Sequence, residues 1–107
     1  RDSIQALGMT NSAPVWSPDG KSLALVVSFS GNPDIFLYSI RNKRLVRLTN
    51  HYGIDTEPSW SPDSKKIIFT SDRSGSPQLY EINTKSKRKK RLTPITYSIH
   101  RKIIRMT

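Results

Sequence analysis

The stretch APVWSPDGK, residues 13–21, returns as EPSWSPDSK at residues 57–65, and this repetition decides the fold. The same spacing of 44 residues relates the triplet RLT at 47–49 to RLT at 91–93. A fixed period of about 40–50 residues is typical of repeat architectures, in which one supersecondary unit buries its apolar face only against a neighbouring unit. The sequence therefore predicts two copies of one structural unit.

Each copy carries short apolar or alternating runs between turn residues, which indicates β-strands rather than helices. The predicted strands cover residues 13–16, 22–28, 34–40, 45–48, 57–60, 66–71, 78–83 and 89–92. Four strands in a repeat of this length make one blade of a β-propeller. We therefore predict an all-β fold, a β-propeller fragment of two four-stranded antiparallel blades.

The repeat also divides the chain. We expect a lead-in over residues 1–12, one blade over 13–55, a second over 56–93, and a basic tail over 94–107 that departs from the repeat. Because propellers typically have 4–8 blades, we expect these two blades to be a piece of a larger propeller.

The turns and tryptophans have expected structural roles. Gly20 closes a Ser-Pro-Asp-Gly turn in the left-handed conformation, and Ser64 stands at that position in the second copy, where we expect some strain. Trp16 and Trp60 are expected to pack between blades. Asp19 and Asp63 lie in matching turns, where a carboxylate accepts backbone N–H groups, so their duplication favours a structural role.

The positive charge is concentrated at one end of the chain. The net charge is +10, of which residues 1–84 carry +1 and residues 85–107 carry +9. The run from Lys85 to Arg91 is either a patch for nucleic acid or an anionic surface, or a solvated hairpin on an outer strand. No aromatic residue interrupts the run, which favours the hairpin and predicts no nucleic-acid partner.

Motifs of enzymes and cofactor sites are sparse. The chain has no cysteine, which excludes disulfides and thiolate metal sites and leaves the compartment open. No nucleophile elbow, P-loop or metalloprotease motif occurs, so we predict no enzyme activity, no cofactor and no metal. His51 and His100 are interpreted as loop and tail residues, and Asp72 and Arg73 as a local ion pair.

The repeat resembles a known family. Pro-x-Trp-Ser-Pro-Asp followed by an apolar strand is similar to the WD40-like PD40 propeller repeat. The stretches IDTEPSWSPD at 54–63 and FTSDRSGSPQLY at 69–80 more closely resemble the TolB family of the Tol–Pal envelope system. The resemblance spans about residues 8–93, and the sequence from Pro94 onward does not follow the family's next blade.

The resemblance implies a periplasmic, six-bladed propeller with a separate α/β domain. Such a protein binds the lipoprotein Pal through one propeller face, supports outer-membrane integrity and cell division, and is exploited by some colicins. Other Tol proteins are further possible partners, and no membrane insertion is implied.

The loops that enter the Pro-x-Trp strands are the predicted working surface. Successive blades bring these loops to one propeller face, and by resemblance this face receives Pal. The partner-binding residues expected from the two loops are Thr10, Asn11, Ala13, Asp55, Thr56 and Glu57.

Two other functions remain open from the sequence. Similar repeats occur in the propeller of prolyl-oligopeptidase-like serine peptidases, where they gate a separate hydrolase domain. A basic nucleic-acid-binding fragment is the other alternative. An open reading frame that extends this segment would distinguish an exported protein from a hydrolase.

Overall fold

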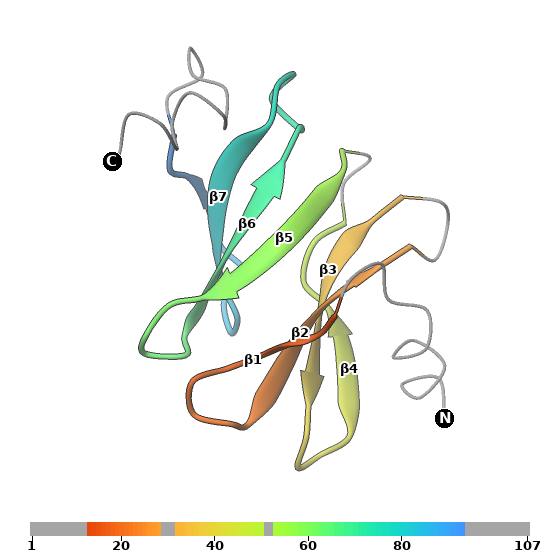
Figure 1. Ribbon diagram of the computed structural model, residues 1–107, viewed down its shortest axis with the longest axis vertical. Helices are drawn as coiled ribbons and strands as arrows, with labels where there is room; N and C mark the ends of the chain where they lie inside the picture. Colours follow the sequence, from red (N-terminus) through yellow and green to blue (C-terminus); the bar gives the residue numbers. More distant parts are fainter. Residues whose placement is uncertain (1–12, 29–31, 51–52, 94–107) are drawn as a thin grey trace.

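Two four-stranded antiparallel sheets make up the protein (Figure 1). The structure is a computed structural model and describes residues 13–28, 32–50 and 53–93. The first sheet contains β1 (Val15–Trp16), β2 (Ser22–Val27), β3 (Asp34–Ser39) and β4 (Arg44–Arg47), paired in chain order. The second contains β5 (Asp55–Trp60), β6 (Lys66–Ser71), β7 (Gln78–Asn83) and β8 (Lys89–Arg91), also in chain order.

The predicted all-β fold and its eight strands are confirmed. Two strand boundaries differ from the prediction by two residues: β1 is reduced to two residues, whereas β5 begins at Asp55, two residues early. The other boundaries agree with the prediction to within one residue. The predicted division between the two units after residue 55 therefore falls at the first residue of β5, while the predicted lead-in 1–12 and tail 94–107 lie outside the described residues. Over the described ranges, no helix is long and apolar enough to cross a membrane.

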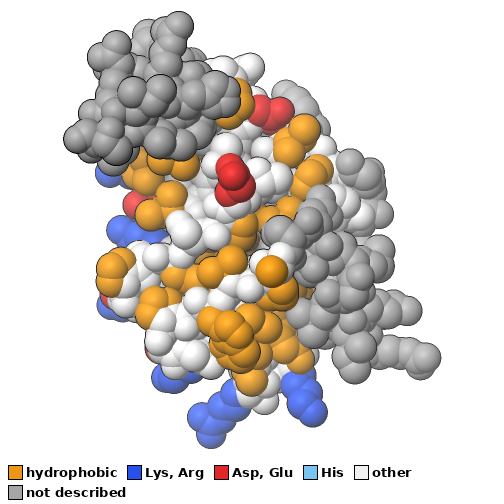
Figure 2. Space-filling view, in the orientation of Figure 1, with side chains coloured by type: hydrophobic (Ala, Val, Ile, Leu, Met, Phe, Trp, Pro, Cys, Tyr) orange, Lys and Arg blue, Asp and Glu red, His pale blue; other side chains and the backbone are white. Residues whose placement is uncertain are grey.

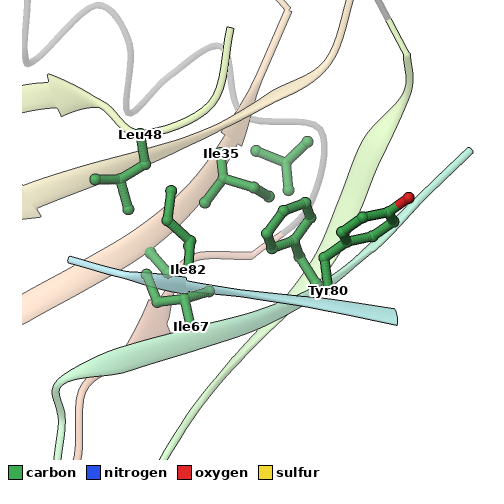
Figure 3. Close-up of a cluster of buried hydrophobic side chains, with 8 residues drawn as sticks. Ile35, Leu48, Ile67, Tyr80 and Ile82 are labelled. Atoms are coloured by element: carbon green, nitrogen blue, oxygen red, sulfur yellow. The ribbon is translucent and has the colours of Figure 1, made fainter. Parts of the chain in front are cut away.

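The main core lies between the two sheets (Figure 3). Strand alternation points every second residue toward the neighbouring sheet. The buried hydrophobic residues of this core are Ala24, Val26, Ile35 and Leu48 from the first sheet with Ile67, Phe69, Tyr80 and Ile82 from the second. Hydrophobic burial between the sheets therefore joins the two repeats.

A second cluster covers the opposite face of the first sheet. It consists of Leu23, Leu25, Val27 and Phe36. Three of these residues have the same repeat positions as Ile67, Phe69 and Tyr80 in the second sheet. Each repeat thus has a front face, carrying these positions, and a back face. The front face of the second sheet packs on the back face of the first.

The two tryptophans differ in burial, and the prediction that both pack between blades is wrong for Trp16. The Trp60 side chain packs against the main core, and its Nε1 donates to the carbonyl of Val15 at 2.9 Å. Trp16 is 58% exposed, because the front face of the first sheet has no preceding sheet among the described residues. Hydrophobic side chains gather on the face shown in Figure 2, and the large exposed ones of the described ranges are Trp16, Ile54 and Leu92.

Matching turns close the β1–β2 and β5–β6 hairpins. Gly20 has φ 72° and Ser64 has φ 63°, so both residues adopt the left-handed conformation that was expected. This conformation is strained for Ser64 because it has a Cβ atom. The Ser64 hydroxyl accepts a hydrogen bond from the backbone N–H of Asp19 at 3.1 Å, so this side chain links the turns of the two sheets.

The carboxylate of each turn holds the turn closed. Asp19 accepts hydrogen bonds from the Ser17 hydroxyl at 2.6 Å and from the Lys21 N–H at 3.0 Å. Asp63 makes the same two bonds, with the Ser61 hydroxyl and the Lys65 N–H. In both turns the serine hydroxyl, followed by the backbone N–H, lowers the pKa of the aspartate below its ordinary 3.8. The predicted structural role of both aspartates agrees with these contacts.

Candidate functional site

A polar network lies where the third strand of each sheet begins. In the first sheet, the Thr49 hydroxyl donates to buried Asp34 and accepts the backbone N–H of Ile35. Arg47 binds the other oxygen of Asp34 and donates from Nε to the Thr49 carbonyl. The second sheet repeats this arrangement with Gln78, Arg91 and Thr93 at the corresponding positions. The network therefore fixes the sheet end that carries the predicted site.

The segment from Gly53 to Asp55, which leads into β5, is attached to both sheets at this end. The Ile54 N–H donates to the Asp72 carboxylate at 2.6 Å, and the Ile54 carbonyl accepts the Asp72 N–H at 3.3 Å. The Asp55 N–H donates to the carbonyl of Pro33 in the first sheet at 3.1 Å, and the Asn32 amide donates to the Gly53 carbonyl at 3.4 Å. These bonds give the incoming loop a fixed position.

A buried ion pair lies beneath this segment. Asp55 is fully buried, and one of its oxygens binds the Arg73 guanidinium at 2.8 Å. Arg73 also donates from Nε to the Ser71 hydroxyl at 3.0 Å. Its guanidinium lies 5.6 Å from the Phe69 ring centroid and 5.2 Å from that of Tyr80, a cation–π geometry. Arg73 therefore connects the site to the core between the sheets.

The expected ion pair of Asp72 with Arg73 is corrected by these contacts. Arg73 turns inward to Asp55, because the buried carboxylate and two aromatic rings offer it a larger set of contacts. Asp72 instead accepts the N–H of Ile54. The other oxygen of Asp55 is buried and accepts no hydrogen bond within the part of the chain that the structure describes.

A β-bulge displays Glu57. Thr56 pairs with Thr70 and Ser59 with Ile68, so β5 has one more residue than β6 over this interval. Glu57 has φ 56°, and its side chain is exposed. A non-glycine residue in this conformation costs about 1–2 kcal/mol, and such strain and bulges are concentrated at functional sites. The bulge turns a carboxylate outward on a rigid strand.

The structure places the predicted site residues in different environments. Thr56 is half-buried and Glu57 exposed at the start of β5, where Asp55 lies beneath them as a supporting group rather than a contact surface. Ala13 is exposed before β1, at the repeat position equivalent to Glu57. Thr10 and Asn11 lie outside the described residues, as do His51 and His100.

Sequence reasoning missed Arg73 and Ser71 as supports of the site. Arg73 lies 18 residues from Asp55, so no short motif contains the pair. The available signal was the position of Arg73, a cation that follows an apolar strand. A cation buried there requires a carboxylate partner. Among the described residues, no group of three or more acidic or histidine side chains could hold a metal ion.

The two sheets are antiparallel, have four strands each and pack face to face. This architecture is that of consecutive blades in a β-propeller protein. Comparison with known families agrees with this class. The family model for the TolB beta propeller domain, PD40, matches residues 1–102, so the chain belongs to this family and the resemblance seen in the sequence is confirmed.

Individual relatives carry the same name. The chain is 53% identical over 38 residues to the Tol-Pal system protein TolB of Ruthia magnifica subsp. Calyptogena magnifica, which is 36% of this chain and 9% of that protein. The crystal structure of TolB from Acinetobacter baumannii has a TM-score of 0.73 and 46% identity, over 81% of this chain and 22% of that one. A putative TolB from Agrobacterium tumefaciens has a TM-score of 0.72 and 31% identity, over 82% of this chain and 33% of that one.

A more distant structure shares the fold alone. It is oligogalacturonate lyase from Vibrio parahaemolyticus, with a TM-score of 0.57 and 22% identity over 71% of this chain and 20% of that one. The chain thus spans a third or less of the proteins to which it is similar.

Proposed function

We propose that this chain is the protein-binding segment of a TolB-like periplasmic propeller, and that it binds the lipoprotein Pal without catalysing a reaction. Through this contact it supports outer-membrane integrity and cell division. Other Tol proteins and colicins are further candidate partners of the same surface. The proposal is supported by the similarity to a relative, the Tol-Pal system protein TolB, and by the geometry at the start of β5.

The observation that carries the proposal is the bulge with exposed Glu57 beside half-buried Thr56. The backbone there is held by the hydrogen bonds of Ile54 and Asp55, and from beneath by Arg73. A rigid site loses little conformational freedom when a partner binds, so more of the contact energy appears as affinity. An outward carboxylate also supplies orientation and partner choice.

Substitution of Thr56 tests the site. Thr56→Arg places a long cation beside Glu57 and should weaken Pal binding by more than about tenfold, or about 1.4 kcal/mol, in a calorimetric titration. Lys87→Thr changes an exposed residue in the turn at the opposite end of the second sheet and should leave the affinity unchanged. Circular dichroism checks that both variants keep the strand content. Equal affinity of the wild type and the Thr56 variant would contradict the proposal.

A further inference from the structure

The hairpin formed by β7 and β8 displays basic side chains next to a hydrogen-bonded turn. We call residues 84–91 the basic hairpin. The Asn83 side-chain oxygen accepts the N–H groups of Lys85 and Ser86 at 2.9 and 3.0 Å, and the Asn83 carbonyl accepts the N–H of Lys87 at 2.8 Å. Lys87 has φ 61°, a conformation that costs energy for a residue with a Cβ atom. These hydrogen bonds therefore fix the backbone from which the cations project.

The charge of the basic hairpin is not neutralised within the described residues. Its six cations are Lys85, Lys87, Arg88, Lys89, Lys90 and Arg91, and all are exposed. None of them forms an ion pair with another described residue. The nearest ion pair joins Lys66 to Glu81 at 3.4 Å. A shallow depression of about 340 Å³ lies beside these two residues and is also lined by cations of the hairpin. The surface is thus strongly positive over one sheet edge.

The equivalent hairpin of the first sheet is less basic: its exposed cations Arg41, Lys43 and Arg44 are followed by hydrophobic residues of β4. Leu45 and Val46 pack against the hydrophobic clusters where the second sheet has the exposed Lys89 and Lys90. Arg47 is paired with the carboxylate of Asp34, whereas the neutral Gln78 stands at the position equivalent to Asp34 in the second sheet. The extension of the cations along the last strand is therefore a property of the second repeat and not of the blade as such.

The turn of the basic hairpin and the proposed Pal site lie at opposite ends of the second sheet. In Figure 1, β5 begins toward the top of the view, whereas the β5–β6 turn lies below. The Thr84 N–H donates to the Lys65 carbonyl at 3.0 Å, so the turn of the basic hairpin lies beside that lower turn. One end of the sheet can therefore bind a partner while the other end contacts a second surface.

We propose that the basic hairpin binds the surface of an anionic phospholipid bilayer. Cations on the turn and on the adjoining edge strand β8 can face a negatively charged surface, and each adds to an attraction that fades within about 8 Å at physiological salt. Single-stranded nucleic acid is disfavoured because the hairpin has no aromatic side chain on which a base could stack. The binding is peripheral, since the hairpin has no apolar side chain to insert.

Vesicle co-sedimentation tests this inference without any knowledge of the Pal site. The chain should sediment with vesicles of phosphatidylcholine mixed with phosphatidylglycerol, and binding should fall as salt is raised. Pure phosphatidylcholine vesicles should not retain it. Equal binding to both kinds of vesicle would overturn the inference, as would absence of binding to either at low salt.

A matched pair of variants locates the binding. Substituting Lys87, Lys89 and Lys90 by Gln should lower the affinity for anionic vesicles at least about tenfold. The control variant removes the same charge from the first hairpin, by substituting Gln for Arg41, Lys43 and Arg44. Its affinity for anionic vesicles should fall clearly less. Equal losses in the two variants would show a general charge effect and refute the assignment. Tighter binding of a single-stranded oligonucleotide than of the vesicles, at the same salt, would refute the choice of lipid.

Discussion

The two sheets hold the same polar network with different charge. In the first, Asp34 binds Arg47 and Thr49, whereas in the second the neutral Gln78 takes the place of the carboxylate. The threonine hydroxyl accepts the backbone N–H of the third strand in both. The shared part is the set of hydrogen bonds to the backbone. The ion pair is an addition to it, and the repeat tolerates its loss.

The second difference between the sheets concerns their faces. The first sheet buries hydrophobic residues on both faces, whereas the second buries them mainly on the front face. At the back of the second sheet, the equivalents of Val26 and Leu37 are Thr70 and Glu81. Substitutions on the front face of the second sheet are therefore expected to lower the stability more than substitutions on its back face.

Loss of an aromatic ring between the sheets is the largest expected effect. Phe69 is fully buried and stacks on Tyr80 at a centroid distance of 5.9 Å, beneath the Arg73 guanidinium. Phe69→Ala should lower the free energy of unfolding by about 3–5 kcal/mol in urea denaturation. Thr70→Ala, on the back face of the same strand, is the control and should cost less than about 1 kcal/mol. Similar losses from the two would remove the distinction between the faces.

The next largest effects are expected from the two polar networks, which should contribute differently to the free energy of unfolding. Asp34→Ala removes an acceptor bound to a cation, and should cost about 1.5–3 kcal/mol before screening, since hydrogen bonds to charged groups are the stronger ones. Because the Arg47 side chain is 39% exposed, we expect the low end of this range. Gln78→Ala removes neutral bonds and should cost about 0.5–1.5 kcal/mol. Thermal unfolding of both variants measures the gap, and a larger cost at Gln78 would reverse the comparison.

The turn glycine and its serine counterpart give a smaller, opposite pair of effects. No atom lies within 4 Å of a Cβ built at Gly20, so Gly20→Ala should cost only the strain of the left-handed backbone, about 1–2 kcal/mol. Ser64→Gly should relieve that strain and stabilise the chain by less than about 1 kcal/mol, because the hydrogen bond from Asp19 is lost. Destabilisation by Ser64→Gly would show that the link between the turns outweighs the strain.

Acid should loosen both turns alike, and this is the smallest effect. The lowered pKa of Asp19 and Asp63 means that their stabilisation is present above pH 3.8 and is lost as pH falls through the folded-state pKa. Carboxyl NMR titration should place both pKa values below 3.8. Ser17→Ala should raise the pKa of Asp19 and leave that of Asp63 in place. A change at both sites would imply coupling between the turns.

Local features of the molecule could be predicted from the sequence. The strands follow from period-two alternation, and the turns follow from Pro, Asp and Gly at fixed positions, since each depends on neighbours a few residues away. The start of β5 lies two residues before the predicted start, because Asp55 has low strand propensity, and only the tertiary bond to Pro33 and the bulge reveal that this segment pairs.

Features that depend on distant partners could not be predicted. Either Asp72 or Asp55 could have been the ion-pair partner of Arg73. The burial of Asp55 beside the aromatic rings favours Asp55. The exposure of Trp16 has the same origin, because identical repeat positions do not have identical neighbours. Within the candidate site, the sequence located Asp55, Thr56 and Glu57 together but did not distinguish the buried residue from the exposed ones.

Packing of a front face on a back face has a consequence for symmetry. The contact joins two different surfaces, so it is heterologous, and a two-fold axis cannot generate it from identical units. Repeating the same contact carries each further unit around in one rotational direction. The series either closes into a ring or continues as an open array. The arrangement that buries Phe69 against the first sheet thus also sets the handedness with which any further blade is added.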